Sequence, residues 1–151
     1  MRADLRAISA ATAGRPRPRV LVVVDRLPGT LRDVYIATEG SYLTALVEIA
    51  GGEPIAPKAP HNYTQISTEA LVVFDPEVVF DMVQALSSPV AVPGELAENS
   101  AAVWQTISIR AVKDQRIYTV SDKRFVHPSQ FAIQAAREMA KRIHPGALVP
   151  E

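Results

Sequence analysis

Few residues of this sequence have the type and spacing that catalysis or metal binding requires. Asp75 and Glu77 flank Pro76, an arrangement more typical of a solvated turn than of a catalytic pair of carboxylates. The absence of cysteine excludes disulfides, zinc–thiolate sites, iron–sulfur clusters and thiol catalysis. The histidines lie far apart in the sequence and have no metal-ligand spacing: His61, His127 and His144.

The motifs that mark nucleotide-binding and hydrolytic α/β proteins are also missing. No G-x-G-x-x-G follows a predicted strand, and neither a Walker A motif nor a G-x-S-x-G elbow is present. Gly51-Gly52 follows a predicted helix, so we interpret it as a helix stop and not as a phosphate cradle. The sequence therefore favours binding over catalysis, with an α/β enzyme or nucleotide-binding domain as the alternative.

One candidate binding position follows from the expected sheet. Residues 20–24 are a continuous run of valine and leucine, typical of a strand buried on both faces in a parallel sheet. Asp25 and Arg26 come directly after it, and ligands of open α/β sheets bind beyond such strand ends. We therefore name Arg26 as a candidate ligand contact, the alternative being a surface ion pair with Asp25.

Strand and helix patterns alternate along the rest of the chain. Ser41 and Ser67 are suitable N-caps, and Gly14 and Gly51 are suitable stops. We expect residues 53–66, which hold three prolines, to be mostly loop, and we expect a core position for Trp104. The pattern predicts an α/β fold, a Rossmann-like three-layer lobe with a mainly parallel central sheet and helices on both faces. The expected strands are 20–24, 34–37, 78–80 and 116–120, and the expected helices are 3–13, 41–50, 67–74, 100–109 and 128–144.

Length and charge describe one neutral domain. The chain has 151 residues, with 16 basic and 16 acidic side chains, so it has no overall field to hold nucleic acid. The charge is uneven, because residues 1–19 contain five arginines against Asp4 alone. No apolar run is long enough to span a bilayer, and the N-terminal stretch lacks the apolar core of a signal peptide.

Four stretches, in order, resemble the C-terminal lobe of one family: the helical-backbone periplasmic binding proteins of ABC importers for cobalamin, haem and iron–siderophores. The resemblance covers roughly residues 3–145. It departs from the family pattern at Thr64, where proline is usual, at Gln115, where glycine is usual, and over 126–129. The matching stretches are residues 17–24 (RPRVLVVV), 35–52 (YIATEGSYLTALVEIAGG), 63–79 (YTQISTEALVVFDPEVV) and 104–120 (WQTISIRAVKDQRIYTV).

The resemblance implies a domain organisation. Residues 1–14 would be the end of the helix that joins two lobes, residues 15–19 a basic proline-rich connector, and residues 20–151 the C-terminal lobe. The N-terminal lobe and the export signal would lie outside this sequence, which would be either a piece of a longer chain or a naturally separate half. Family members are periplasmic or extracellular and membrane-associated, so we expect that location here.

The resemblance also implies a function without chemical change. The chain would bind cobalamin, haem or a ferric siderophore between two lobes, with no cofactor or resident metal of its own, and deliver it to an ABC permease. Glu69 corresponds to the glutamate that docks on permease arginines; the simpler interpretation is that it only complements its helix dipole. An isolated lobe could instead form a homodimer through its uncovered face. The candidate ligand contacts are Arg26, Tyr63, Arg124 and His127, with loop packing for Tyr63 and a solvated surface position for Arg124 as the alternatives.

Overall fold

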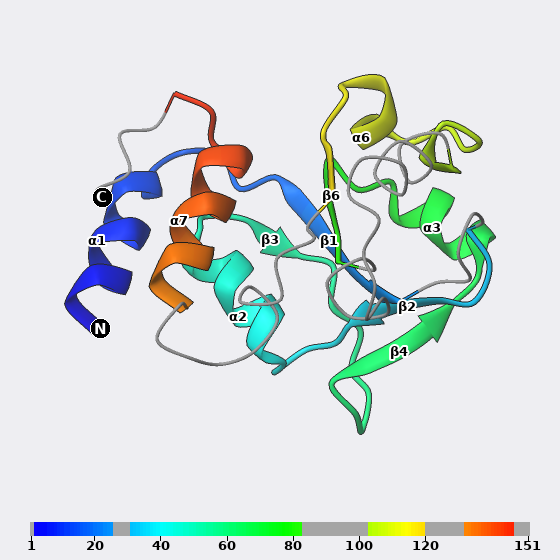
Figure 1. The fold of residues 1–151 in the computed structure, drawn as a ribbon, viewed down its shortest axis with the longest axis horizontal. Coiled ribbons are helices and arrows are strands. Elements are labelled where there is room, and N and C mark those ends of the chain that lie inside the picture. Colours follow the sequence, from blue (N-terminus) through cyan, green and yellow to red (C-terminus); the bar gives the residue numbers. More distant parts are fainter. Residues whose placement is uncertain (1, 26–30, 83–102, 120–131, 147–151) are drawn as a thin grey trace, which may run out of the picture.

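The computed structural model describes residues 2–25, 31–82, 103–119 and 132–146. In this part of the chain a central sheet lies between two layers of helices (Figure 1). The layer of α1, α2 and α7 covers one face, and α3 and α6 lie on the other. The predicted three-layer α/β fold is therefore confirmed.

The sheet is parallel at its centre and antiparallel along one side. Its strands follow the order β4-β2-β1-β5-β6, and β3 pairs separately with β1. β1 is parallel to β3 and β5, and β5 is parallel to β6, whereas β2 is antiparallel to both β1 and β4. The strands are β1 (Arg19–Asp25), β2 (Val34–Ala37), β3 (Glu53–Pro54), β4 (Tyr63–Ile66), β5 (Val78–Asp81) and β6 (Ile117–Thr119).

Strand β1 is buried on both faces, as its apolar run predicts. Val20, Val22 and Val24 belong to the core beneath α1, α2 and α7. Leu21 and Val23 belong to the core on the opposite face. Because successive side chains of a strand point to opposite faces, a continuous apolar run supplies both cores at once.

Local capping signals mark the starts of α2 and α3 and the ends of α1 and α2, as predicted. The side chain of Ser41 accepts a hydrogen bond from the backbone N–H of Thr44, and that of Ser67 accepts one from the N–H of Ala70. Gly14 and Gly51 follow α1 and α2 with positive φ angles of 79° and 91°. No helix in the described ranges is long and apolar enough to cross a membrane. The helices are α1 (Arg2–Thr12), α2 (Tyr42–Ile49), α3 (Thr68–Phe74), α6 (Arg110–Lys113) and α7 (Ala132–Ile143).

The structure differs from two sequence-based expectations. Residues 53–66, expected to be mostly loop, also contain β3 and β4, because Tyr63–Ile66 finds its partner in β2, about thirty residues away. The helix expected over 100–109 is interrupted. The chain turns tightly after Trp104, where the N–H of Ile107 bonds the carbonyl of Trp104, and Ile109 is extended before α6 starts.

Arginines bind the C-terminal ends of three helices. Arg17 donates to the carbonyl of Glu48 in the last turn of α2, at 3.3 Å, and to that of Gly52 just after the helix, at 2.8 Å. Arg19 donates to the carbonyl of Phe74 at the end of α3. Arg116, just before β6, donates to the carbonyls of Arg142 and Ile143 at the end of α7. A cation at these positions satisfies carbonyls that have no partner within the helix and complements its dipole.

Gly51 allows α1, α2 and α7 to meet. Its φ is +91°, and a Cβ atom there would lie 2.5 Å from Thr12 Oγ1 and 2.8 Å from His144 Nε2. The buried His144 side chain is 2.9 Å from the carbonyl oxygen of Gly51. Both the backbone conformation and the close approach therefore require glycine.

We predict that Gly51→Ala lowers the free energy of unfolding by about 2 kcal/mol or more, because strain and a steric clash add. Gly14→Ala is the matched control, since Gly14 has φ +79° but no atom within 4 Å of the position that a Cβ would occupy. It should cost only about 1–2 kcal/mol, the strain of the left-handed conformation. Urea unfolding of both variants measures the difference in their free energies of unfolding. An equal decrease in the two variants would contradict the close contact of Gly51 with Thr12 and His144 as a cause.

Candidate functional site

The three parallel strands β1, β5 and β6 end together at one edge of the sheet. Asp81 pairs with Val23 on one side and with Thr119 on the other, so the last residues of these strands lie in adjacent rows. We call this the carboxyl edge, defined by Asp25, Asp81 and Thr119. Ligands of open α/β sheets bind beyond such an edge. Arg26 follows Asp25 in the sequence, but it lies outside the described residues, as do Arg124 and His127.

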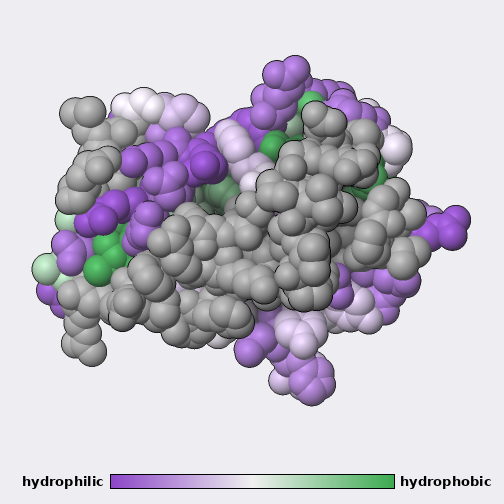
Figure 2. Space-filling view, viewed as in Figure 1, coloured by the Kyte–Doolittle hydropathy of each residue, from purple (hydrophilic) through white to green (hydrophobic). Residues whose placement is uncertain are grey.

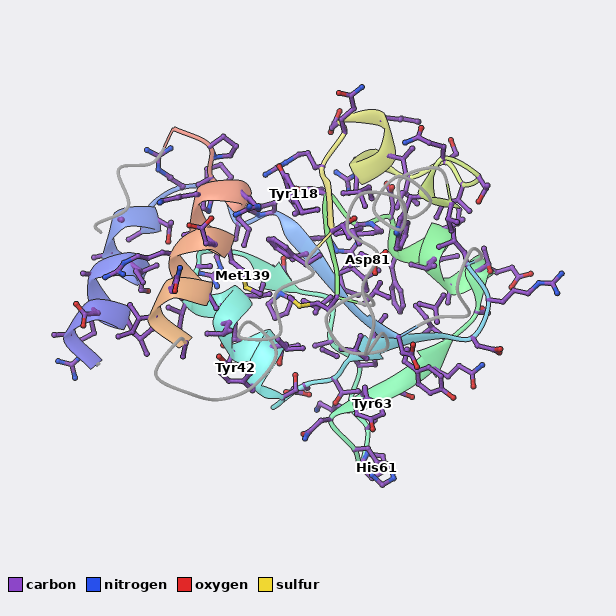
Figure 3. The ribbon with its side chains drawn as sticks, viewed as in Figure 1. Tyr42, His61, Tyr63, Asp81, Tyr118 and Met139 are labelled. Carbon is purple, nitrogen blue, oxygen red and sulfur yellow. The ribbon has the colours of Figure 1, made fainter. Side chains whose placement is uncertain are left out.

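Tyr63 lies exposed on the outer strand of the sheet. Its side chain is 56% exposed, and its ring stands edge-on to that of Tyr35, with the centroids 6.3 Å apart at 84°. Figure 3 shows Tyr63 at the lower end of the molecule, with His61 beyond it. Tyr63 therefore presents an aromatic surface suited to a flat conjugated ligand, while Tyr35 supports it from the sheet side.

A buried polar network fixes the chain just before Tyr63. Thr38, which is completely buried, donates its hydroxyl to the carbonyl of His61 and its backbone N–H to the carbonyl of Asn62 at 3.0 Å. The hydroxyl of Thr44 in turn lies 3.0 Å from the carbonyl of Thr38. The His61 side chain is exposed on this fixed backbone. The sequence offered no signal for this position, because the threonines and His61 are far apart in the chain.

Tyr42 opens α2 at the same end of the molecule (Figure 3). Its hydroxyl is buried and has no hydrogen-bond partner within the described structure. Desolvation by burial raises the pKa of Tyr42. The group therefore stays a neutral phenol at physiological pH and retains an unused donor and acceptor.

A buried hydrogen bond lies behind the carboxyl edge. Trp104 Nε1 donates to Asp81 Oδ2 at 2.9 Å, and both side chains are fully buried. The core position predicted for Trp104 is thus confirmed, but its partner was not foreseen. The only signal was an acidic residue directly after a buried apolar run. The bond ties the end of β5 to the chain before α6.

Glu69 lies on the opposite side of the sheet from α2 and α7. It is exposed in the first turn of α3, where a carboxylate favourably meets the helix dipole. The hydroxyl of Thr68 donates to the carbonyl of Leu31 at 3.0 Å and secures this end of the helix. Glu69 is therefore held on a fixed backbone and points to solvent, while its docking role stays a prediction.

The acidic turn after α3 forms an ion-pair cluster with Arg110. Arg110 Nε lies 3.0 Å from Asp75 Oδ2, and Arg110 Nη1 lies 2.9 Å from Glu77 Oε1. The backbone N–H of Arg110 also donates to Asp75 Oδ1 and is the main reason that the pKa of Asp75 is lowered. Asp75 and Glu77 thus join α3 to α6. Within the described residues no group of three or more histidines, cysteines and carboxylates is placed to hold a metal ion.

Comparison with known proteins gives the family. The model of the periplasmic binding protein family matches residues 1–123. The chain belongs to the periplasmic binding protein family. A cobalamin-binding protein of Halobacterium salinarum is 31% identical over 128 residues, which are 74% of this chain and 34% of that protein. The haem uptake protein IsdE of Staphylococcus aureus is 26% identical over 115 residues, which are 76% of this chain and 37% of IsdE. The chain thus spans about a third of the length of these curated relatives.

Solved structures confirm the fold of a periplasmic binding protein. An ABC transporter substrate-binding protein of Listeria monocytogenes superposes with a TM-score of 0.75 at 26% identity, over 93% of this chain and 53% of that one. A periplasmic haem-binding protein of Pseudomonas aeruginosa gives a TM-score of 0.76 at 21% identity, over 99% of this chain and 52% of that one. These relatives are named as binding proteins, and family members of this kind act in the periplasm or outside the cell.

We predict that Asp81→Leu destabilises the protein by about 1–3 kcal/mol, because the indole N–H of Trp104 loses its acceptor in a dry core. Asp81→Asn is the matched control, since its amide oxygen can still accept the bond. Urea unfolding followed by Trp104 fluorescence measures both. If Asp81→Asn lowered the free energy of unfolding as much as Asp81→Leu does, the carboxylate charge, and not the hydrogen bond to Trp104, would be the stabilising feature.

Proposed function

We propose that the chain is a lobe of the solute-binding component of an ABC importer. The component captures a metal-chelate nutrient between two lobes and delivers it to the permease without changing it chemically. The observation that carries this proposal is the carboxyl edge of the sheet in a chain of this family. Three parallel strands end there, and three of the four candidate ligand contacts follow these strands in the sequence.

The proposed ligand is cobalamin, haem or a ferric siderophore. A corrin, a porphyrin and a catecholate siderophore each present a large flat or aromatic surface around the metal, which the exposed ring of Tyr63 would contact. Arg26 and Arg124 would meet anionic groups of the ligand, and His127 would approach its metal. The likeness to a cobalamin-binding protein and to a haem uptake protein supports this ligand class. In this proposal an N-terminal lobe supplies the second wall of the site.

Delivery requires a docking contact outside the binding cleft. Glu69 is suited to it, because it is exposed on the side of the sheet that α2 and α7 do not cover. A carboxylate held by a capped helix accepts a bidentate hydrogen-bond pair from arginine at little entropic cost. The proposal places the protein outside the cytoplasm, at the membrane that holds its permease.

A titration tests the ligand class. The protein is titrated with hemin, cyanocobalamin and the catecholate siderophore ferric enterobactin, and binding is followed by ligand absorbance and by quenching of Trp104, the single tryptophan of the sequence. We expect saturable binding of one of the three, weaker for this lobe alone than for a two-lobe protein, because half of the contacts are absent. If a two-lobe protein bound none of them, the metal-chelate assignment would be wrong.

Charge reversal tests docking. We predict that Glu69→Arg abolishes uptake in a transport assay and leaves ligand affinity unchanged, because Glu69 lies outside the cleft. The reversal should cost about 1 kcal/mol of stability or less through the helix dipole. Glu53→Arg, at another exposed glutamate, is the matched control and should transport normally. A loss of ligand affinity in Glu69→Arg would place this residue in the cleft and refute its docking role.

A further inference from the structure

The exposed apolar surface of the described chain is concentrated beside Glu69. The described residues include three exposed large hydrophobic side chains: Tyr63 at 56%, Val72 at 43% and Val73 at 80%. Tyr63 belongs to the candidate ligand site, whereas Val72 and Val73 lie three and four residues after Glu69 on α3. Residues at this spacing share one face of a helix. We call Glu69, Val72 and Val73 the α3 outer face.

Helix stability does not explain the two valines. Valine is a poorer helix former than alanine, leucine or lysine, and at 80% exposure Val73 gains almost nothing from burial. The side of α3 that packs on the sheet is already provided by Leu71, which is fully buried. The exposed valines thus cost the isolated protein helix propensity with little gain from burial, and a partner that covers them would supply that gain.

The surroundings hold the α3 outer face in place. The side chain of Ser67 caps the first turn, and Thr68 Oγ1 bonds the carbonyl of Leu31. At the other end Arg19 bonds the carbonyl of Phe74, and Asp75 is paired with Arg110. Valine side chains are themselves restricted at χ1. A partner that binds this face therefore meets a preorganised surface and orders little of it on binding.

The position of α3 limits what can cover it. Figure 1 shows α3 and α1 at opposite ends of the molecule. Helix α3 also lies on the face of the sheet opposite the layer of α1, α2 and α7. On the face shown in Figure 2 the described surface is mainly hydrophilic, with only small green areas. The α3 outer face combines one fixed carboxylate with two adjacent apolar groups, so its complement is a cation beside an apolar side chain.

We propose that Val72 and Val73 form, with Glu69, a single mixed docking surface for the extracytoplasmic side of the ABC permease. This inference rests on the proposed function. The permease arginine that pairs with Glu69 is flanked by apolar side chains that cover the two valines. Burial of the valines excludes water from the ion pair, which strengthens a contact that is weak when solvated.

Binding to the permease tests the proposal. The ligand-loaded protein is passed over an ABC permease–ATPase complex of this family, from the same organism, held in lipid nanodiscs. Val72→Ser with Val73→Ser should weaken binding by about tenfold or more, because the two side chains lie at the centre of the contact. Val72→Ile with Val73→Ile should bind normally. Ala45→Ser, at an exposed position on α2, is the control for a polar change elsewhere.

Two further measurements separate the outcomes. Ligand affinity and the thermal midpoint of the serine pair should match the unchanged protein, since both valines point to solvent. If Glu69→Arg loses permease binding but the serine pair does not, the valines are not part of the surface. If neither variant loses it, the docking proposal itself fails. If light scattering shows a dimer that the serine pair dissolves while permease binding persists, a second copy covers this face and the inference is overturned.

Discussion

The opposed directions of strands and helices are the constraint on which this structure depends. Because α2, α3 and α7 run against the parallel strands, their C-terminal carbonyls gather at the edge where those strands begin. Arg17, Arg19 and Arg116 lie just before or at the start of β1 and β6, and each donates to one of these helix ends. The partial negative charge of the three helix termini is thereby satisfied by the same chain segments that start the sheet.

The residues that stabilise the fold and those that we propose to bind a ligand lie at different edges of the sheet. The edge where strands begin is filled by helix ends, arginines and the close contact at Gly51. The carboxyl edge and the outer strand β4 carry the polar and aromatic groups that a ligand can reach, with Tyr63 exposed and Asp81 tied to Trp104 behind them. The α3 outer face lies on the remaining side, so the ligand capture and docking that we propose would use different surfaces of one lobe.

The structure gives two of the arginines near the start of the sequence a role in folding. Five arginines within residues 1–19 give the chain a basic start. The structure shows that Arg17 and Arg19 bind backbone carbonyls of α2, the following turn and α3. These two arginines therefore contribute to folding through hydrogen bonds between residues more than thirty positions apart.

The sequence by itself determined the features with local causes. The valine run 20–24 defined the central strand, Ser41 and Ser67 the helix starts, and the first-turn position of Glu69 its exposure. Only the tertiary structure decided the pairing of β4, the Asp81–Trp104 bond and the orientation of Val72 and Val73. Residues 70–74 are all apolar, so their sequence does not show which side of the helix faces the core. A helical pattern identifies the buried side only where polar residues alternate with apolar ones. Contacts between distant residues depend on how the layers pack, which no local pattern contains.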